Sequence, residues 1–264
     1  MKYFLLTIDL EEFIPEEFGI KEKLDGLEIS KLGITRLIDL LRDNKIKATF
    51  FITLKFANAY PEIIKELIKE GHEIGLHAYS HDHRYDKMPE KEVYYYLKKA
   101  KDEIERKFKI KLNGFRAPQM STPNPKILKE LGIKYDSSLH PTYIPGKYNN
   151  FSKKRRIMLK DNFIILPISV TPLLRLPFSW LWFRTLGLNY SKICTLWTLT
   201  DQNYINIYFH PWDFSDFNKN YILLRNTGLK ALINLDEYLK WCNKNNLKFD
   251  TISNYLKNER NQTF

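Results

Sequence analysis

Apolar and polar positions alternate along the first half of the chain in a pattern that predicts strands followed by helices. A short apolar run over residues 3–8 has the length and composition of a buried strand and ends in a group of acids. Residues 48–52 and 73–76 are two further runs of this kind, and apolar residues recur at helical spacing between them. Ser30 is the expected cap of the first helix, whose apolar face consists of Ile34, Leu37, Ile38 and Leu41.

The same alternation continues through the rest of the chain. Three more helices are expected, from Pro61 to the stop at Gly71, from about Pro89 to Phe108, and from Asn124-Pro125 to Gly132. Further strands are expected at residues 114–116, from Tyr135, at 163–167 and at 205–209, before a last amphipathic helix through residues 229–241. This order predicts parallel strands with crossover helices in one α/β domain that covers residues 1–264.

The segment over residues 172–199 does not follow this pattern. It is rich in leucine, tryptophan and phenylalanine but is interrupted by Arg175, Pro177 and Arg184. A membrane span needs about 20 predominantly apolar residues, so these interruptions argue against one. Two interpretations stay open: an insertion that packs into the core, or an interfacial patch that faces lipid. The basic run Lys153–Arg156 nearby slightly favours the second.

Charge and cysteine content narrow the classes of partner and compartment. The net charge of +11 favours anionic partners such as phosphorylated substrates, an acidic membrane surface or nucleic acid. No nucleic-acid motif accompanies the basic run, so no nucleic-acid partner is expected. Cys194 and Cys242 imply no disulfide framework and are expected to be buried. Because a strand is expected from residue 3, we see no room for a secretory signal and expect a cytoplasmic protein, which could lie peripherally on the inner face of the membrane.

Two carboxylates and two histidines are the first candidates for chemistry. Asp9 and Glu11 are two residues apart at the end of the first expected strand, so their side chains point the same way. His77 and His81 follow the strand at residues 73–76 and can turn toward one point. Two imidazoles and one carboxylate form a three-ligand set that leaves positions open for water and substrate, as in catalytic zinc sites. The second carboxylate could then serve as a base.

Five stretches stand in a fixed order along the chain: Thr7–Glu11, His77–His81, Gly114–Pro118, Tyr135–Ser138 and Tyr208–Asp213. Through them the chain resembles the polysaccharide deacetylases, which form carbohydrate esterase family 4, over nearly its whole length. The D-x-acid spacing of the first motif is most similar to the branch that includes the polysaccharide-export-associated deacetylases. The resemblance implies a distorted (β/α) barrel of about seven parallel strands with helices outside.

The resemblance also implies a metal site. Glu11, His77 and His81 would hold a divalent metal ion, with Zn²⁺ expected first and Co²⁺, Ni²⁺ or Mn²⁺ as alternatives. Many family members carry adjacent aspartates in the first motif, whereas Leu10 follows Asp9 in this sequence. The carboxylate ligand is therefore expected to be Glu11, with Glu12 as the alternative.

Catalytic roles follow from the same comparison. Asp9 would be the general base, Arg116 would pair with Asp9, and His210 would protonate the leaving amine. These assignments agree with the need of amide hydrolysis for both a base and an acid. Asp136 is a candidate for orienting His210, although it reads equally well as a turn residue at a strand end.

Other residues near these motifs are expected to contact the substrate or to be structural. Pro118, Gln119 and Trp212 are the expected substrate-binding residues, and Gln119 stands where family members often have an aromatic residue. His72 is expected to be structural, and the histidines expected in loops near the rim of the site are His83 and His140.

The resulting expectation is an enzyme, a metal-dependent hydrolase that removes an acetyl or formyl group from an amino sugar. A lipid- or nucleotide-linked sugar is preferred. The net positive charge of the chain would attract the phosphate of such a substrate, and the apolar segment would suit a lipid phosphate carrier. One alternative keeps the fold but hydrolyses a non-sugar amide such as a ureide ring. Another is a catalytically inactive relative that binds glycan or lipid. An iron oxygenase with two histidines and a carboxylate would share the ligands but not the strand-helix alternation. The oligomeric state is left open.

Overall fold

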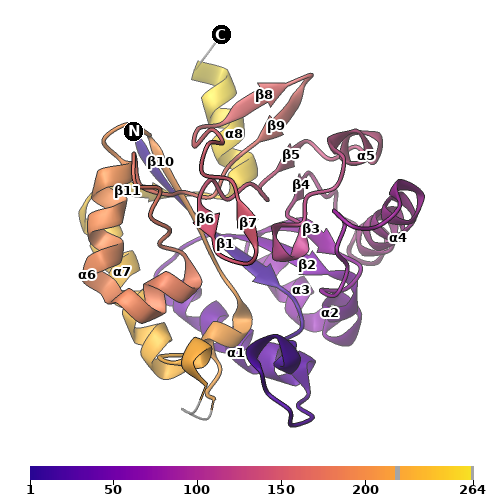
Figure 1. Cartoon of the computed structure of the whole chain (residues 1–264), viewed down its shortest axis with the longest axis horizontal. Coiled ribbons are helices and arrows are strands. Elements are labelled where there is room, and N and C mark those ends of the chain that lie inside the picture. The colour runs from indigo at the N-terminus through magenta and orange to yellow at the C-terminus, as the bar shows by residue number, and fades with distance from the viewer. Residues whose placement is uncertain (218–220, 263–264) are drawn as a thin grey trace.

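A curled sheet of mostly parallel strands forms the centre of the computed structural model, which describes residues 1–217 and 221–262 (Figure 1). Its strand order is β10-β1-β2-β3-β4-β5-β9-β8, with β11 also paired to β1. All neighbours from β10 to β9 are parallel, and β8 is antiparallel to β9. These strands are β1 (Lys2–Leu10), β2 (Thr49–Thr53), β3 (Glu73–Ala78), β4 (Gly114–Phe115), β5 (Tyr135–Asp136), β8 (Met158–Lys160), β9 (Phe163–Ile165), β10 (Tyr204–Phe209) and β11 (Leu247–Phe249).

The two ends of this parallel series meet through the segment that follows β9. Ser169 N donates to Asn206 O of β10 at 2.8 Å, and Asn206 N donates to Ser169 Oγ at 2.8 Å. Asn206 Nδ2 also donates to Pro167 O at 3.0 Å. These bonds close the curl without a regular strand ladder. The expected distorted barrel of about seven parallel strands is therefore confirmed.

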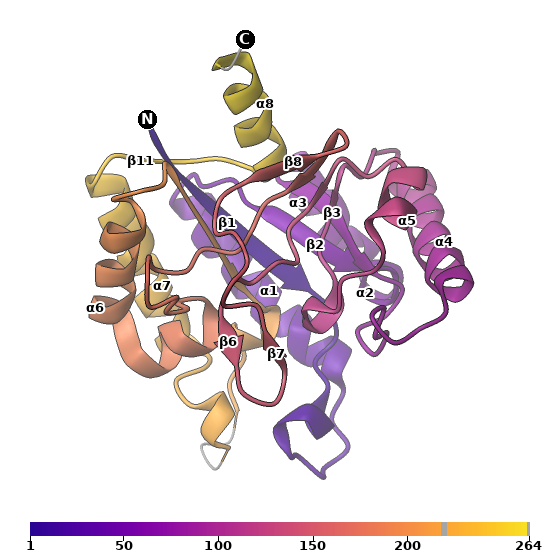
Figure 2. The same ribbon diagram turned by 45° about the horizontal axis from the view of Figure 1, so that its top comes forward.

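Helices pack around the outside of the sheet, and a hairpin lies at one of its ends (Figures 1 and 2). The hairpin consists of β6 (Tyr143–Ile144) and β7 (Tyr148–Asn149), which pair antiparallel. The last helix, α8 (Ile252–Gln262), lies with the two chain ends on the other side of the molecule (Figure 2). The remaining α-helices are α1 (Gly26–Asp43), α2 (Leu54–Ala59), α3 (Pro61–Lys69), α4 (Glu90–Phe108), α5 (Pro125–Glu130), α6 (Trp180–Thr198) and α7 (Leu229–Lys244). The described residues also form four short 3₁₀ turns, η1 (Pro15–Phe18), η2 (Pro118–Met120), η3 (Pro211–Phe214) and η4 (Ile222–Leu224).

Side-chain alternation along β1 separates two hydrophobic clusters and creates the polar site. Phe4, Leu6, Ile8 and Leu10 belong to the large cluster between the sheet and the outer helices. Tyr3 and Leu5 belong to a smaller cluster with Phe51 of β2, Tyr135 of β5 and Tyr255 of α8. Because side chains alternate along a strand, the next inward positions are Thr7 and Asp9, both buried. The barrel interior is thus apolar near α8 and polar at the carboxyl ends of the strands.

One glycine makes room for an aromatic ring in this interior. A Cβ atom at Gly75 of β3 would lie 2.6 Å from Cδ1 of Phe51, so no larger residue fits without displacing that ring. The Phe51 ring in turn lies 4.5 Å from the guanidinium carbon of Arg116. The glycine therefore helps to place a ring that supports a buried cation.

The expected cap at Ser30 is wrong. Asp25 caps α1, and its side chain accepts hydrogen bonds from the backbone N–H groups of Leu27 and Glu28, each at 3.1 Å. Ser30 is buried inside the helix, which begins more than a turn earlier than the apolar spacing indicated. The helix start expected at Asn124-Pro125 is confirmed: α5 begins at Pro125, and the Asn124 side chain accepts a hydrogen bond from the Lys126 N–H at 3.0 Å.

The apolar segment at residues 172–199 contains α6 and contributes to the core. Phe178 and Phe183 are fully buried, whereas Leu173 and Leu174 are 81% and 60% exposed. The packing interpretation therefore holds for part of the segment. Within the described ranges of the chain, none of the helices has both the length and the apolarity that are needed to cross a membrane.

Candidate functional site

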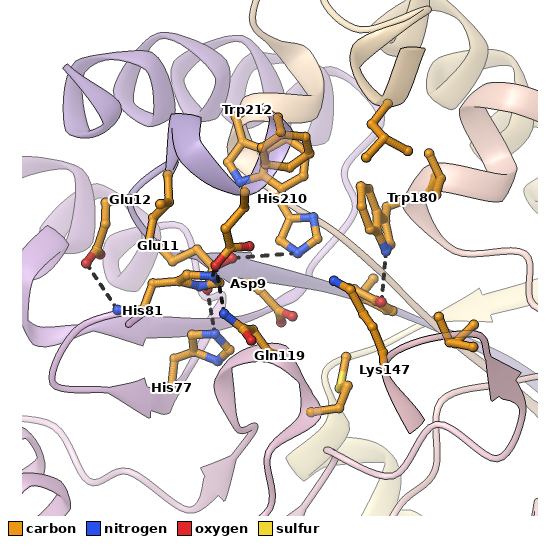
Figure 3. Close-up of a pocket in the computed structure, with 18 of the residues that line it drawn as sticks. Asp9, Glu11, Glu12, His77, His81, Gln119, Lys147, Trp180, His210 and Trp212 are labelled. Atoms are coloured by element: carbon orange, nitrogen blue, oxygen red, sulfur yellow. Dashed lines mark hydrogen bonds and ion pairs between the residues drawn. The ribbon is translucent and has the colours of Figure 1, made fainter. Parts of the chain in front are cut away.

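Glu11, His77 and His81 meet in a buried cluster at the carboxyl end of the barrel (Figure 3). Glu11 Oε2 lies 2.7 Å from His77 Nε2 and 2.5 Å from His81 Nδ1. Glu11 directly follows β1, His77 belongs to β3, and His81 lies in the loop after β3. Two strands separated only by β2 thus deliver three potential ligand atoms that all lie within 4.8 Å of one another.

The donor set fits a divalent metal ion. One carboxylate oxygen and two imidazole nitrogens are the ligands of many catalytic zinc sites, and they leave coordination positions free. Burial raises the pKa of the Glu11 carboxyl, but the charges and hydrogen bonds of His81 and His77 outweigh burial and hold this pKa well below its usual range. Glu11 is therefore ionised, as a metal ligand must be.

Glu12 has a separate role beside this cluster. Its Oε1 accepts a hydrogen bond from the His81 backbone N–H at 3.1 Å, and its Oε2 accepts one from Thr53 Oγ1 at 3.1 Å. Lys55 Nζ lies 3.4 Å from Oε1. Glu12 therefore ties the His81 loop to the end of β2, and the geometry favours Glu11 over Glu12 as the carboxylate ligand.

Arg116 holds Asp9 inside the barrel. Arg116 Nη1 lies 2.9 Å from Asp9 Oδ1, and the same nitrogen donates to Thr7 Oγ1 at 2.6 Å. Its Nε and Nη2 donate to the backbone oxygen and hydroxyl of Ser137 at 3.0 and 2.9 Å. The planar guanidinium is fully buried and held on several sides, so Asp9 has a fixed partner. The contact expected between these two residues is present, and its catalytic role stays a prediction.

His210 lies on the opposite side of Glu11 from the other two histidines (Figure 3). It follows β10, and its Nε2 lies 3.7 Å from Glu11 Oε1. The ring stacks on Trp212 with centroids 4.3 Å apart and an interplanar angle of 9°. Trp180 meets the ring edge to face at 4.9 Å. Two tryptophans therefore fix the plane of an imidazole whose Nε2 faces the cluster.

Asp213, not Asp136, is the carboxylate beside His210. Asp213 Oδ2 lies 3.5 Å from His210 Nδ1 and accepts a hydrogen bond from the His210 backbone N–H at 2.8 Å. Asp136 instead accepts from the backbone N–H and hydroxyl of Ser138, as a turn residue would, and burial raises its pKa to about 6. Asp213 stands three residues after His210 within the His-Pro-Trp-Asp motif. This spacing is a sequence signal from which the carboxylate partner of His210 could be identified.

A buried arginine holds Asp213 in turn. Arg184 Nε lies 2.7 Å from Asp213 Oδ1, and both side chains are fully buried. The other guanidinium nitrogens donate to the backbone oxygens of Arg225 and Leu223 at 2.7 and 3.0 Å. Sequence reasoning missed this residue, because no spacing relates residue 184 to residue 213.

A cavity of about 230 Å³ opens onto the cluster. One part of its wall is ionic, with Asp9, Glu11, Glu12 and Glu17 beside the three histidines. Lys147 of the β6–β7 turn is the only lysine or arginine that the described residues contribute to the wall, and it points toward the site (Figure 3). The remaining wall is apolar or aromatic and consists of Ile14, Phe18, Met120, Ile144, Tyr148, Trp180, Leu181, Trp182, Tyr208, Trp212 and Leu223, with Gln119 between the two parts.

The three residues expected to bind substrate have different positions. Trp212 lines the cavity but is only 4% exposed, because it packs against His210, Phe18 and Trp180. Gln119 lines the cavity, and its amide contacts protein groups on both sides. Pro118 is buried next to Gln119 and does not belong to the cavity lining. A role of Pro118 in shaping the acyl site would therefore be indirect.

The other histidines have structural contacts. His72 Nδ1 accepts a hydrogen bond from the Ala48 N–H at 3.1 Å, which agrees with the structural role expected for it. His83 is half-buried against Tyr96, with ring centroids 4.4 Å apart. His140 is fully buried, and its Nδ1 lies 2.8 Å from the Tyr148 hydroxyl. The expectation of a loop residue at the rim therefore does not describe the environment of His140.

Two arginines from the basic and apolar segments are internal. Arg155 lies 2.7 Å from Asp201 and donates to Val170 O, so one member of the basic run serves the fold. Arg184 is buried, as described above. These two cations are therefore not available to a membrane surface. Cys194 and Cys242 are free and buried, as expected.

Sequence comparison finds a family match over part of the chain. Residues 26–135 match the model of the polysaccharide deacetylase family. A peptidoglycan deacetylase from Helicobacter pylori is 31% identical over 124 residues, which are 46% of this chain and 42% of that protein. The chain thus spans less than half of the curated relatives that it matches first, from 17% to 42% of their length.

Structural comparison covers the whole chain. The crystal structure of a putative polysaccharide deacetylase from Mycobacterium smegmatis matches with a TM-score of 0.70 at 19% identity, and the match covers 100% of this chain and 92% of that chain. A crystal structure of the allantoinase PuuE matches with a TM-score of 0.65 at 15% identity, over 96% of this chain and 87% of that chain. At these identities the likeness establishes the fold alone.

Proposed function

We propose that this chain, whose residues 26–135 match the polysaccharide deacetylase family, is a metal-dependent hydrolase that removes an N-acetyl or N-formyl group from an amino sugar. The observation that supports the proposal most is the convergence of Glu11, His77 and His81 beside both Asp9 and His210. A metal-ligand set, a base candidate and an acid candidate then share one cavity. We further propose that residues 1–264 act as a single catalytic domain.

Glu11, His77 and His81 would hold the metal ion in this proposal. A divalent ion held there supplies a Lewis acid that polarises the acyl carbonyl and makes water a better nucleophile. Zn²⁺ is proposed first because mixed imidazole and carboxylate ligands suit it, and Co²⁺, Ni²⁺ or Mn²⁺ are alternatives.

Asp9 would accept a proton from the attacking water. Its carboxylate lines the cavity, and Arg116 restricts its orientation through the 2.9 Å ion pair. A base that is already oriented needs no rearrangement when the water attacks, and general base catalysis contributes typically about 10²- to 10⁴-fold.

His210 would donate a proton to the amine nitrogen as the C–N bond breaks. Its Nε2 faces the cluster, while its Nδ1 faces Asp213, which can hold the ring and stabilise its protonated form. Water adds to the acyl carbon, Asp9 takes its proton, and the products are a carboxylate and a free amine. An amine is a poor leaving group until it is protonated, so loss of the acid should slow C–N cleavage.

The preferred substrate is an amino sugar linked to a lipid or a nucleotide through phosphate. Lys147 offers a cation to a phosphate, and the apolar wall formed by Ile144, Leu181 and Leu223 could receive an apolar group. A lipid-linked substrate would place the protein at the inner face of the membrane, and a nucleotide-linked one would leave it in the cytoplasm.

A panel of acylated amino sugars tests the proposal. Metal-reconstituted protein would be assayed for acetate and amine release from free, nucleotide-linked and lipid-phosphate-linked N-acetyl sugars. We expect release from at least one phosphate-linked sugar, at a higher kcat/KM than from the free sugar. Metal-loaded protein that binds these sugars without releasing acetate or formate would instead support the inactive glycan-binding alternative.

A further inference from the structure

The His81 ring contacts a carboxylate through each of its two nitrogens. Nδ1 lies 2.5 Å from Glu11 Oε2, and Nε2 lies 3.2 Å from Glu17 Oε1. We infer that Glu17 is an outer carboxylate that orients His81 for metal binding and that Gln119 holds Glu17 in place. This inference rests on the proposed metal site and adds two positioning residues to it.

The two metal-site histidines differ in their need for such support. His77 belongs to strand β3, whose backbone pairs with β2 up to Leu76 and again at Ala78, on either side of His77. His81 lies three residues beyond the end of β3, in a loop. His77 Nδ1 has no hydrogen-bond partner in the part of the chain that the structure describes, whereas both nitrogens of His81 have one. The outer carboxylate therefore contacts His81, the histidine that lies outside the sheet.

The turn that bears Glu17 is anchored. Phe18, the next residue, packs against Phe13 and Trp212 with ring centroids 5.0 Å apart in both cases. The turn ends at Gly19 with φ of +73°, a conformation that glycine adopts without strain. The Glu17 side chain is 32% exposed, but a fixed backbone lies beneath it.

Gln119 connects Glu17 to a second loop. Its Nε2 donates to Glu17 Oε1 at 2.7 Å, and its Oε1 accepts from Arg84 Nη1 at 3.2 Å. Both polar atoms of the amide are therefore engaged with protein groups. Gln119 thus does not need a substrate to satisfy its amide, and we assign it to positioning rather than to substrate binding.

Outer hydrogen bonds of this kind orient the ring of a ligating histidine and make the nitrogen that binds the metal more basic, and hence a stronger ligand. Their loss typically weakens metal affinity about 10- to 100-fold. Gln119 should matter only because it holds Glu17, so its loss should cost less and should have no further effect once Glu17 is absent.

Zn²⁺ titration of the full chain tests the inference without any substrate. Four variants would be compared with the unsubstituted chain: Glu17→Ala, Gln119→Ala, the double variant, and Glu16→Ala as a control. Glu16 belongs to the same turn, is exposed, and has no side-chain hydrogen bond or ion pair with any residue in the described ranges. Glu16→Ala therefore removes the same charge from the turn as Glu17→Ala does, without removing a contact. Metal-free thermal unfolding of each variant checks the fold, and Glu17→Gln replaces Glu17→Ala if the latter unfolds.

We expect about a 10- to 100-fold weaker Kd for Glu17→Ala, a smaller loss for Gln119→Ala, and a double variant equal to Glu17→Ala. The visible spectrum of bound Co²⁺ should change in Glu17→Ala, because the ring of one ligand is no longer fixed. Equal Zn²⁺ affinity in Glu17→Ala and Glu16→Ala would overturn the inference while leaving the metal site intact. No Zn²⁺ binding by the unsubstituted chain would overturn both.

Discussion

Arg116 and Asp9 form a buried ion pair across the interior of the barrel, with 2.9 Å between Nη1 and Oδ1. Arg116 directly follows β4 and Asp9 belongs to β1, so the pair connects two strands that are separated in the sheet by β2 and β3. The Phe51 ring of β2 packs against the guanidinium, and Ser137 takes two of its hydrogen bonds. The geometry of the proposed base therefore depends on three strands besides its own.

Asp9→Asn should separate catalysis from metal binding. The amide keeps the size of the side chain but cannot accept the proton of water, so kcat should fall about 10²- to 10⁴-fold. Zn²⁺ stoichiometry should stay unchanged, because Asp9 is not one of the three proposed ligands. Steady-state kinetics and metal analysis on one preparation measure both effects, with Asp43→Asn on the exposed end of α1 as the control. Near-normal turnover in Asp9→Asn would mean that another group is the base.

The histidines should divide into metal ligands and structural residues. His77→Ala and His81→Ala should each abolish stoichiometric Zn²⁺ binding while the chain stays folded. His72→Ala should keep Zn²⁺ but lose about 1–3 kcal/mol of unfolding free energy, because the buried Ala48 N–H loses its acceptor. Metal analysis and urea unfolding distinguish the two classes. Unchanged metal content in both His77→Ala and His81→Ala would refute the ligand assignment.

Breaking the Arg184–Asp213 pair should destabilise the fold and impair the acid. Removing one partner of a fully buried pair leaves an uncompensated charge, which costs about 3–5 kcal/mol. Arg184→Met and Asp213→Asn should therefore both lower the urea midpoint, and the double variant should lose less than the sum. Asp213→Asn should also lower kcat more than it changes KM, because His210 loses the carboxylate on its Nδ1 side. Additive losses in the double variant would show that the two residues are not coupled.

Asp136 should make stability depend on pH. Burial raises its pKa to about 6, although the hydrogen bonds of Ser138 and the charge of Arg116 oppose this rise. A raised pKa in the folded state means that this contribution is fully present below the ordinary value of 3.8 and is lost as pH rises through about 6. Asp136→Asn should thus be more stable than the unsubstituted chain at pH 8, by about 3 kcal/mol or less, and similar near pH 4. Urea unfolding at the two pH values measures this, and an equal difference at both would contradict it.

Lys147 should discriminate between phosphate-linked and free sugars. Lys147→Ala removes the only lysine or arginine that lines the cavity within residues 1–217 and 221–262, so KM for a phosphate-linked acetyl sugar should rise several-fold or more. For a free sugar KM should stay nearly constant, and kcat should change little for either. Lys153→Ala, in the exposed part of the basic run, is the matched control. An equal rise of KM for both substrates would indicate a general effect on the hairpin.

The sequence predicts the parts of the site that follow strand periodicity. Asp9 and Glu11 face inward because alternation along β1 requires it, and His77 follows from the same rule on β3. The order of strands and helices indicates parallel strands with crossover helices, and the family resemblance adds the barrel. The two-residue strands β4 and β5 are too short to have a periodicity of their own, and only the alternation with the helices around them predicts them.

The rest depends on contacts between distant segments, which no local pattern encodes. Arg184 meets Asp213 because α6 packs beside η3 and η4, and neither helical spacing nor composition relates the two positions. The β6–β7 hairpin and its Lys147 lie in a stretch that we did not assign to any element. Glu17 lies in a short turn whose direction is set by Phe18 packing on Trp212, almost two hundred residues later. Tertiary packing therefore decided which acids and cations surround the predicted ligands.

Metal-dependent deacylation at the cluster of Glu11, His77 and His81 can be measured directly. The most direct measurement is acetate and amine release from a phosphate-linked N-acetyl amino sugar by the full chain, first stripped of metal and then titrated with Zn²⁺. We expect negligible release without metal, full activity at one Zn²⁺ per chain, equal amounts of acetate and amine, and no recovery by His81→Ala. Release that persists in the metal-free chain, or that Zn²⁺ restores equally in His81→Ala, would contradict this expectation.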